Sequence, residues 1–494
     1  MPPIPVPFPD STFPGTHFQE SGGRIINSYV EPLGAGAPQQ IIYRRAPGLR
    51  NFGTTTQTGF RGAIEVNGVL YCAFNNSLVK LTGAGGAAVS VGTLAGTAKG
   101  FFARNTRSAA GAPAEPFPGL VFCDPDGNYA SIDTAANTVT MSYLAPGFPT
   151  FPAPNSVCVL DNYFFYTIGN GQVWASGLNS ITVGATSFAT AESKPDGLIR
   201  GVAWAGQLFL FGPVTTEVWV NAGTTPFPFQ RSVVIPRGLA GPFCVSAFED
   251  NFSRSLIWVA DDNSVVRLNG YNPEKISPPD LDGLIEREPA VNGVKRTLEM
   301  SCFVSRGHAF ILLSSPTWSW VFDTNTNKWA ERNSYLRSRS RITGGVYAFN
   351  KWLCGDILTG NVQEITNQVH TEIGDPLRWR LESGAVENFP VGARVGRADF
   401  EFVTGVGMAI GDDPIETNPV VEISWSDDGG QNYYAPIQRK LGRQSQTRQL
   451  VSLVSCTGRS SWNARRWRLD IADPVYVGFM GAWQNTSSKV SDIG

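Results

Sequence analysis

Few residues in this sequence combine the types and the spacing that catalysis or metal binding requires. The run SDDGGQNY, from Ser426 to Tyr433, comes nearest to an enzyme motif, but it fits the Asp-box pattern SxDxGx[TS]xxW only loosely. In that box the Ser and Asp side chains bind backbone groups of a hairpin turn, away from any reaction. We therefore predict that Ser426 and Asp428 stabilise a turn and have no catalytic role.

The metal and nucleotide patterns are also incomplete. Asp124, Asp126 and Asn128 have the alternate spacing of a calcium loop, but Pro125 interrupts it and no bidentate Glu follows. A solvated hairpin turn is the better interpretation. The run GAGG that begins at Gly83 lacks the Lys-Ser/Thr pair of a phosphate-binding loop. These patterns predict that the protein holds no metal and no cofactor.

Candidate nucleophiles and bases are scattered along the chain. None of the three His residues lies at ligand spacing from a Cys pair, and the sequence contains no GxSxG motif. The seven Cys residues form no CxxC and lie in apolar stretches, so we expect buried free thiols in a reducing compartment. They are Cys72, Cys123, Cys158, Cys244, Cys302, Cys354 and Cys456. The sequence therefore predicts a protein that is not an enzyme.

Two clusters of Arg are the remaining candidate sites. Arg337, Arg339 and Arg341 alternate with Ser, which on a strand would place three guanidinium groups on one face. The second cluster consists of Arg465, Arg466 and Trp467. Each cluster fits a solvated strand face or an interface with another subunit or partner, where Arg and Trp are enriched. If the first cluster is exposed, replacing its three Arg by Ser should leave the isolated fold nearly unchanged.

Composition excludes several classes of protein. The chain has 494 residues, with 39 Lys and Arg against 41 Asp and Glu, so its net charge of −2 provides no bulk attraction to DNA or to an anionic membrane. Only 16% of the residues are charged and 42% are hydrophobic, which argues against disorder. Of the basic residues 30 are Arg, the residue suited to planar contacts at interfaces. We expect no signal peptide and no transmembrane segment.

The elements that must position these residues are almost entirely β-strands. Short runs of β-branched and aromatic residues alternate with Asn, Asp and Gly turns, and the 53 Gly and 34 Pro leave few windows for a helix. First strands of candidate units begin near residues 61, 101, 156, 199, 243, 297 and 342. This spacing is typical of four-stranded propeller blades. It predicts a six- or seven-bladed β-propeller, with tandem β-sandwiches as the alternative.

Changes in pattern divide the chain into three parts. Residues 1–23 are Pro-rich and predict an extended arm, which either docks or is disordered. Residues 24–373 carry the repeats and form the predicted propeller. Residues 374–494 contain longer alternating strands, such as Val420–Trp425, and predict a separate C-terminal β-sandwich.

Four motifs lie near the middle of the chain: AESKPDGLI from Ala191, GQLFLFG from Gly206, TEVW from Thr216 and RGLAG from Arg237. Together they resemble the packaged-DNA stabilisation protein, or tail hub (nozzle), of short-tailed bacteriophages. Upstream, NSYV from Asn27 and RRAPGL from Arg44, and downstream the SDDGG run and RKLG from Arg439, extend the likeness along most of the chain. The Pro-rich arm and the Gly/Ala-rich stretches 83–100 and 108–116 depart from it.

The resemblance implies a structural protein of the virion tail that is assembled in the host bacterial cytoplasm. In this family a hexameric ring lies below the portal and its adaptor, extends and helps to seal the DNA conduit, and stabilises packaged DNA. Implied partners are other copies of the chain, the adaptor, tail fibres or tailspikes, and a plug or needle. Genomic DNA would pass through the channel without sequence-specific binding.

Two other functions fit a propeller of this composition. One is a sialidase-like glycosidase, which would need an Arg cluster for the substrate carboxylate and a Tyr nucleophile with an acid partner. The other is a propeller that binds glycans on a host surface. A screen against glycan substrates would distinguish the glycosidase from a structural tail protein, and electron microscopy of virions would distinguish the tail hub from a glycan-binding propeller at the periphery.

Overall fold

Tight turns built on Asn and Gly define the strands of this protein. Asn75 (φ 46°), Asn263 (φ 64°) and Gly171 (φ 93°) lie between the strands of three hairpins, in the left-handed region that these residue types tolerate best.

The computed structural model describes residues 3–109, 115–140, 152–191, 193–252, 255–386, 394–454, 456 and 465–487. Within these ranges α1 (Pro279–Arg287) is the single α-helix, and no helix is long and apolar enough to span a bilayer.

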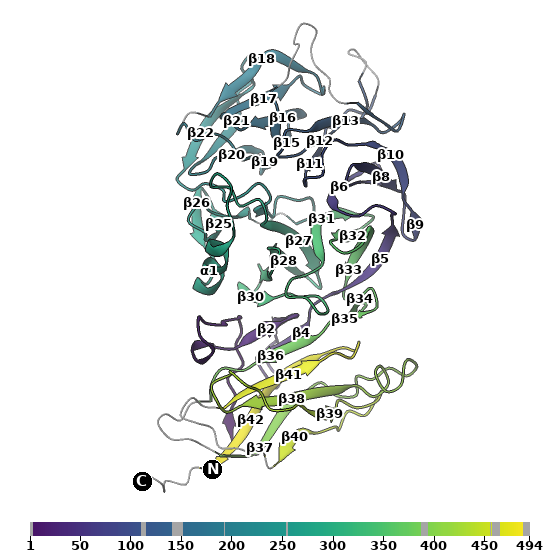
Figure 1. Ribbon diagram of the computed structural model, residues 1–494, viewed down its shortest axis with the longest axis vertical. Helices are drawn as coiled ribbons and strands as arrows, with labels where there is room; N and C mark the ends of the chain where they lie inside the picture. The colour runs from purple at the N-terminus through teal and green to yellow at the C-terminus, as the bar shows by residue number, and fades with distance from the viewer. Residues whose placement is uncertain are drawn as a thin grey trace.

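Seven blades of four antiparallel strands surround a common centre, so this part of the chain is a seven-bladed β-propeller (Figure 1). Five blades are separate four-stranded sheets, and the sixth and seventh are parts of larger sheets. The inner strands of the blades begin within two or three residues of the unit starts expected from the repeat spacing. They are β6 (Phe60–Val66), β11 (Phe101–Arg104), β15 (Pro154–Leu160), β19 (Arg200–Trp204), β23 (Val245–Ser246), β27 (Glu299–Ser305) and β31 (Ile342–Ala348).

Each of the first six blades continues outward from its inner strand in chain order. The first blade continues with β7 (Val69–Phe74), β8 (Ser77–Leu81) and β10 (Val89–Thr93). The second continues with β12 (Leu120–Cys123), β13 (Tyr129–Asp133) and β14 (Thr138–Thr140). The third continues with β16 (Tyr163–Ile168), β17 (Gln172–Ser176) and β18 (Val183–Thr190). The fourth blade continues with β20 (Gln207–Phe211), β21 (Thr216–Asn221) and β22 (Phe229–Ile235). The fifth continues with β24 (Ile257–Val259), β25 (Val265–Asn269) and β26 (Asn272–Lys275). The sixth continues with β28 (His308–Ser314), β29 (Ser319–Asp323) and β30 (Lys328–Glu331).

The seventh blade closes the ring with a strand from the other end of the propeller sequence. Its β31, β32 (Lys351–Asp356) and β33 (Asn361–Thr366) are followed by β5 (Gly48–Thr54), which pairs antiparallel with β33 (Figure 1). The inner strands β31 and β6 then lie side by side. Two short strands, β34 (Thr371–Glu372) and β35 (Asp375–Pro376), extend the sheet beyond β5, and β9 (Gly86–Ala87) pairs with β5 as well.

Two sheets with a shared core form the rest of the molecule, called here the two-sheet unit. One sheet has the order β3 (Ser28–Pro32), β4 (Ile41–Arg45), β42 (Gly478–Ser487), β37 (Arg394–Phe402) and β40 (Val451–Val454). The other contains β2 (Arg24–Ile26), β36 (Trp379–Glu382), β41 (Arg466–Ile471), β38 (Val420–Ser426) and β39 (Ile437–Lys440). Their core is aromatic: Phe400 packs on Trp467 and Phe479 on Trp379.

The structure divides the chain differently from the predicted boundaries at 24 and 374. Residues 24–45 form β2, β3 and β4 of the two-sheet unit, whereas the propeller strands begin with β5 at Gly48. The unit is therefore assembled from both ends of the chain. In addition, β2 pairs with β30 of the sixth blade and with β36, so one sheet runs from the propeller into the two-sheet unit. That the unit is an independent domain stays a prediction.

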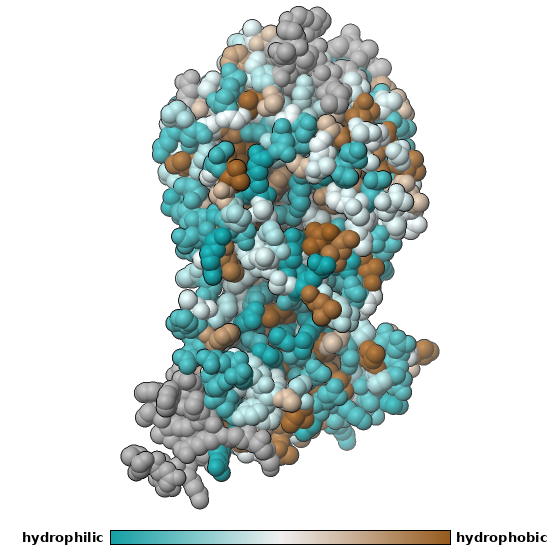
Figure 2. Space-filling view, viewed as in Figure 1, coloured by the Kyte–Doolittle hydropathy of each residue, from teal (hydrophilic) through white to brown (hydrophobic). Residues whose placement is uncertain are grey.

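The first described residues of the Pro-rich arm are extended and lie against the chain's own C-terminal strand, whereas Phe18–Glu20 form a short 3-10 helix (η1). In β1 (Ile4–Pro5), Pro5 pairs with Trp483 of β42, and the Val6 N–H donates to the Ala482 carbonyl at 2.8 Å. The Phe8 ring meets Phe479 edge-on, with centroids 4.9 Å apart. The arm thus covers one edge of β42 next to β4. Figure 2 shows that on this face of the molecule apolar side chains form small groups among hydrophilic ones.

Closure of the seventh blade can be tested at Phe52 of β5. Its side chain is 1% exposed and packs in a core that β5 shares with the first and seventh blades. We expect Phe52→Ala to lower the free energy of unfolding by about 3–5 kcal/mol because it leaves a cavity at the closure. Thermal and denaturant unfolding would measure this. The control is Val89→Ala in β10, which is 55% exposed and should change stability by no more than about 0.5 kcal/mol. Equal effects of the two variants would contradict the assigned closure.

Candidate functional site

A cavity of about 510 Å³ lies at the centre of the propeller, and all seven inner strands contribute to its wall. Its charges are partly paired with one another. Lys99 forms an ion pair with Glu299, and the Thr343 hydroxyl donates to Glu299 at 2.9 Å. Burial opposes ionisation of Glu299, but the charge and hydrogen bond of Lys99 and the Gly344 N–H outweigh it and hold the pKa of this carboxyl below its usual value. In this part of the wall the two opposite charges thus compensate each other.

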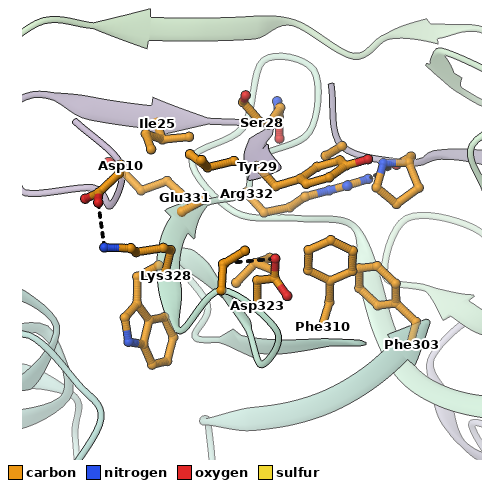
Figure 3. A pocket seen from close by; sticks show the side chains of 18 residues that line it. Asp10, Ile25, Ser28, Tyr29, Phe303, Phe310, Asp323, Lys328, Glu331 and Arg332 are labelled. Carbon is orange, nitrogen blue, oxygen red and sulfur yellow. Dashed lines mark hydrogen bonds and ion pairs between the residues drawn. The ribbon is translucent and has the colours of Figure 1, made fainter. Parts of the chain in front are cut away.

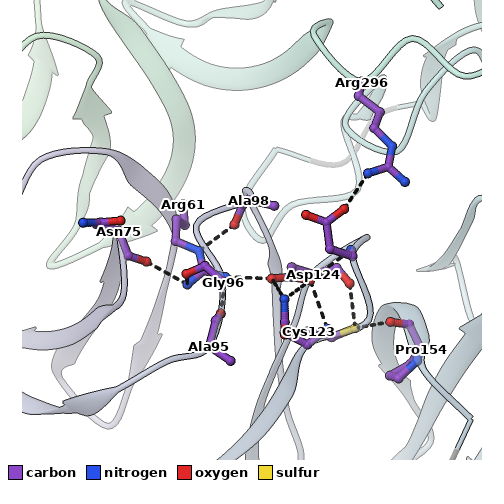
Figure 4. Close-up of polar contacts among 11 residues, drawn as sticks. Arg61, Asn75, Ala95, Gly96, Ala98, Cys123, Asp124, Pro154 and Arg296 are labelled. Atoms are coloured by element: carbon purple, nitrogen blue, oxygen red, sulfur yellow. Dashed lines mark hydrogen bonds and ion pairs between the residues drawn. The ribbon is translucent and has the colours of Figure 1, made fainter. Parts of the chain in front are cut away.

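Arg61 joins the first two blades at the edge of this cavity. Its guanidinium donates to the carbonyls of Asn75 (2.8 Å), Gly96 (3.0 Å) and Ala98 (2.5 Å) and to Asp124 (2.8 Å), as Figure 4 shows. Arg61 is 2% and Asp124 0% exposed. A planar fork of five donors can satisfy several fixed acceptors at once, which Lys cannot do.

The turn that begins at Asp124 is a hairpin turn, as expected, but its first carboxylate is buried rather than solvated. Asp124 accepts hydrogen bonds from the backbone N–H groups of Asp126 (3.0 Å) and Asn128 (3.1 Å) in addition to the Arg61 bond. Its oxygens are therefore occupied by protein donors. Asp126 instead pairs with Arg296 at 2.6 Å on the surface (Figure 4). Within the described ranges no group of three or more His, Cys, Asp or Glu side chains could hold a metal ion.

Arg200 of β19 is the second buried cation of the cavity wall. Its guanidinium lies over the rings of Phe101 and Phe248, 4.2 Å and 5.1 Å from their centroids, and donates to the Pro242 carbonyl at 2.8 Å. Burial lowers its pKa to about 10, so the group stays charged at neutral pH. Neither Arg61 nor Arg200 was among the candidate residues predicted from the sequence. The sequence signal that could have pointed to them is a single Arg next to a Gly within a strand-like run.

The segment with Arg337, Arg339 and Arg341 is a turn and not a strand, so the prediction of three guanidinium groups on one strand face was wrong. Two backbone bonds, Arg337 N–H to Ser334 O and Ser334 N–H to Arg339 O, both 3.0 Å, close the turn between β30 and β31. In this turn the residue in the left-handed backbone conformation is Leu336 and not Asn or Gly. The three Arg side chains consequently point to different surroundings.

Arg341 is buried and Arg337 is exposed. Arg341 donates to both oxygens of Asp356, at 3.1 Å and 2.7 Å, and to Asp375 at 2.9 Å. Burial alone would lower the pKa of the Arg341 guanidinium. The hydrogen bond and the negative charge of Asp356 have the larger effect, so the pKa of Arg341 is raised. Arg339 is half-buried and donates to the Ser340 and Ile342 carbonyls. Of this cluster, Arg337 is the member that the structure leaves exposed to a partner.

The second cluster is buried inside the two-sheet unit. Arg465 forms a bidentate pair with Asp427, at 2.7 Å and 2.8 Å, and is 1% exposed. Arg466 donates to the carbonyls of Ser21 (2.5 Å) and Gln19 (2.9 Å), so it ties the N-terminal arm to β41. Trp467 is 0% exposed and donates to Gln484 at 2.8 Å. These side chains have partners within the protomer, and an interface role for them stays a prediction.

The Asp-box-like run is the hairpin turn that the sequence predicts. Asp428 accepts hydrogen bonds from the Ser426 hydroxyl (2.7 Å) and from the backbone N–H groups of Gln431 and Asn432, both at 3.0 Å. Burial opposes its ionisation, but the N–H of Asn432 and the Ser426 hydroxyl outweigh it and lower the pKa of Asp428 to about 2. The carboxylate is thus committed to the turn.

The cavity at the junction between the sixth blade and the two-sheet unit is small. Its volume is about 20 Å³, close to that of one ordered water, so it cannot take a substrate. Figure 3 shows the Asp10–Lys328 ion pair (2.6 Å) on one side and Phe310 on the other. The neighbouring Arg332 is 1% exposed and binds Glu372 at 2.9 Å and the Pro47 carbonyl at 2.8 Å. The Asp10–Lys328 pair thus joins the N-terminal arm to β30, and Arg332 joins the end of the sixth blade to the sheet of the seventh.

The seven Cys residues are free thiols, as expected, and six of them are buried. Cys158 is partly exposed and lines the central cavity, but burial raises its pKa to about 12. A thiol with so high a pKa is not a nucleophile at neutral pH.

The protein is thus a β-propeller whose seven inner strands surround a central cavity. Residues 26–370 match the family model described as "Bacteriophage P22 Gp10, beta-propeller". The match contains all seven blades and well over half of the chain, so the chain belongs to this family.

One curated relative and two solved structures illustrate the similarity. The tail hub protein gp10 of Salmonella phage P22 is 24% identical over 179 residues, which are 34% of this chain and 37% of that protein. The matched segment thus spans little more than a third of the relative. The WD40 β-propeller domain of Doa1 is 8% identical, with a TM-score of 0.39, and 64% of this chain and 96% of that one are covered. The designed Ika8 protein is 12% identical, with a TM-score of 0.36 and coverages of 70% and 99%.

The contrast between Arg341 and Arg337 gives a matched pair of variants. Arg341→Ser should lower the free energy of unfolding by about 3–5 kcal/mol because it leaves the fully buried Asp356 carboxylate without its cation. Arg337→Ser should stay within about 0.5 kcal/mol of the original protein. Denaturant unfolding of both variants is the measurement. Equal, small effects would contradict the buried ion pair of Arg341 with Asp356.

Asp428→Ala should lower stability by about 1 kcal/mol through the loss of turn hydrogen bonds. Because folding lowers the pKa of Asp428 from 3.8 to about 2, its ionised form stabilises the fold above about pH 4, and this contribution is lost as the pH falls towards 2. The difference between variant and original should therefore be full at neutral pH and shrink in that window. Unfolding curves between pH 2 and 7 would show it. A pH-independent difference would mean that the charge has no part in the turn.

Proposed function

We propose that this chain is a structural subunit of a short bacteriophage tail, a tail hub or nozzle. The observation that carries the proposal is membership of the P22 Gp10 propeller family across all seven blades. The curated relative named tail hub protein gp10 supports the same role. In this proposal the protein is a component of the virion tail and is assembled in the host cytoplasm.

The proposed work of the protein is mechanical. A hexameric ring of copies lies below the portal and its adaptor, extends the DNA conduit and helps to seal it, so that packaged DNA is retained. The central cavity of about 510 Å³ has the size of a small-molecule site, so the duplex must pass between copies and not through a propeller. DNA then needs no sequence-specific contact, in keeping with a net charge of −2.

The chemistry of the described side chains supports a role without catalysis. The charged groups best placed for reaction, Lys99 with Glu299 and Arg61 with Asp124, are bound to each other. The buried thiols have raised pKa values. The proposed partners are other copies of the chain, the adaptor, fibres or spikes, and a plug or needle.

Particles assembled without this protein should package DNA and then lose it, because the confined genome pushes outward through a conduit that is neither extended nor sealed. The measurement is nuclease-protected DNA per particle over time, together with electron microscopy of the tail. Supply of the original gene in trans is the control, and it should restore both the ring and the retained DNA. Stable, full heads in its absence would contradict the proposal.

A further inference from the structure

A second small cavity at the junction of the propeller and the two-sheet unit is rich in cations. Its volume is about 10 Å³, and it is called the Arg pocket here. Arg44 and Arg45 of β4, Arg306 of the turn between β27 and β28, and His370 of the segment between β33 and β34 lie in its wall. No described Asp or Glu does. Separate parts of the chain thus bring three guanidinium groups to one small space.

Arg45 is the most buried cation of the pocket, with 6% of its surface exposed. Its two terminal nitrogens donate to the carbonyls of Asp473 (2.7 Å) and Ile471 (2.9 Å), whereas its Nε is buried and has no hydrogen-bond partner among the described residues. Burial lowers the pKa of this guanidinium to about 9, so it is still charged at neutral pH. A buried cation without a paired anion is costly to the fold.

The other two Arg residues of the pocket differ in their partners. Arg44 forms an ion pair with Glu31 and donates to the Tyr476 hydroxyl, so its charge is compensated. Arg306 is exposed, and among the described residues no carboxylate forms an ion pair with it. Its charge nevertheless reaches into the pocket, because it helps to lower the pKa of His370.

Asp473 is the carboxylate whose charge acts on Arg45, but it does not line the pocket. It accepts a hydrogen bond from the Val420 N–H at 2.8 Å, and burial raises its pKa above the usual value. Since Glu31 is already paired with Arg44, the three cations of the wall stand against two carboxylates. The surroundings of Arg45 are therefore short of negative charge.

The rest of the wall offers neutral hydrogen-bond donors. His370 is uncharged at neutral pH, since burial and the charges of Arg45 and Arg306 lower its pKa to about 4. The Tyr29 hydroxyl stays protonated because burial raises its pKa to about 12. Asn367 adds an amide. An anion at this place would therefore meet donors and no carboxylate of a described residue.

We propose that the Arg pocket binds a chloride ion, which contacts the Arg45 guanidinium and supplies the missing negative charge. The volume holds about one water, so a monatomic anion fits and phosphate does not. A water molecule would fill the space but would leave the buried charge of Arg45 uncompensated. The ion links β4 of the two-sheet unit to the sixth blade, and this role does not depend on the proposed place in a virion.

Thermal unfolding of the full chain in sodium chloride and in sodium gluconate, at equal ionic strength, tests the site. Chloride should raise the Tm until the site is saturated, and at ten times its dissociation constant the folding equilibrium constant should be about tenfold larger. Arg306→Gln should raise the half-saturating chloride concentration about fivefold and keep the fold, since Arg306 is exposed. Arg337→Gln, also exposed but outside the pocket, is the matched control and should respond like the original protein.

His370 provides a readout inside the pocket. In chloride its pKa should be about one unit higher than in gluconate, because the bound anion offsets the repulsion from Arg45 and Arg306. NMR titration of the ring C–H signals of the three His residues would measure it, and His370→Gln would assign the signal. The signal of His17, which is exposed and outside the pocket, is the internal control and should not depend on the salt.

Four outcomes separate chloride binding from its alternatives. An anomalous diffraction peak beside the Arg45 guanidinium, in crystals grown with bromide, would support the site. Equal Tm and equal His370 pKa in the two salts would overturn it. A chloride effect that Arg306→Gln leaves unchanged would place the ion elsewhere and overturn it too. Phosphate that stabilises the original protein as much as chloride does, and loses this effect in Arg306→Gln, would overturn the choice of a monatomic ion.

Discussion

Pairing between β5 and β33 is the interaction on which the rest of this structure depends. A ring of sheets is stable only if its last blade is covered, because an open blade leaves a row of unpaired backbone groups and an exposed core. Here the covering strand comes from the start of the propeller sequence, more than 300 residues before its partner. The entropy cost of closing so long a loop is acceptable because it grows only slowly with the number of residues in the loop. Since β5 follows directly after β4, the same pairing also fixes the two-sheet unit beside the sixth and seventh blades.

Buried Arg residues recur at the places where separate pieces of chain meet. Arg61 joins the first two blades, Arg332 joins the sixth blade to the seventh, and Arg466 holds the N-terminal arm on β41. Each binds backbone carbonyls or a carboxylate, because a guanidinium offers five donors in one plane and stays charged when buried. Part of the Arg bias of the composition therefore serves contacts within this chain, and an interface role for other Arg residues stays a prediction.

This architecture limits what the propeller centre can do. The inner strands enclose a space of ligand size, but its ion pairs are formed between the blades themselves and reinforce the ring. The connections between blades differ from this centre: in the turn between β30 and β31, Leu336 is exposed at a positive φ.

The sequence by itself determined the blades, because a hairpin is a local object. Period-two runs and Asn or Gly at positive φ specify where each strand begins, and the turn at Asp428 follows from side chains only a few residues apart. The family motifs from Asn27 to Arg237 pointed to the correct family for the same reason. Only the tertiary structure decided which strand closes the ring, that β2–β4 join the C-terminal sheets, and that Arg341 and Arg466 are buried while Arg337 is exposed. Those outcomes depend on contacts between residues hundreds of positions apart, and neighbouring residues carry no record of such distant partners.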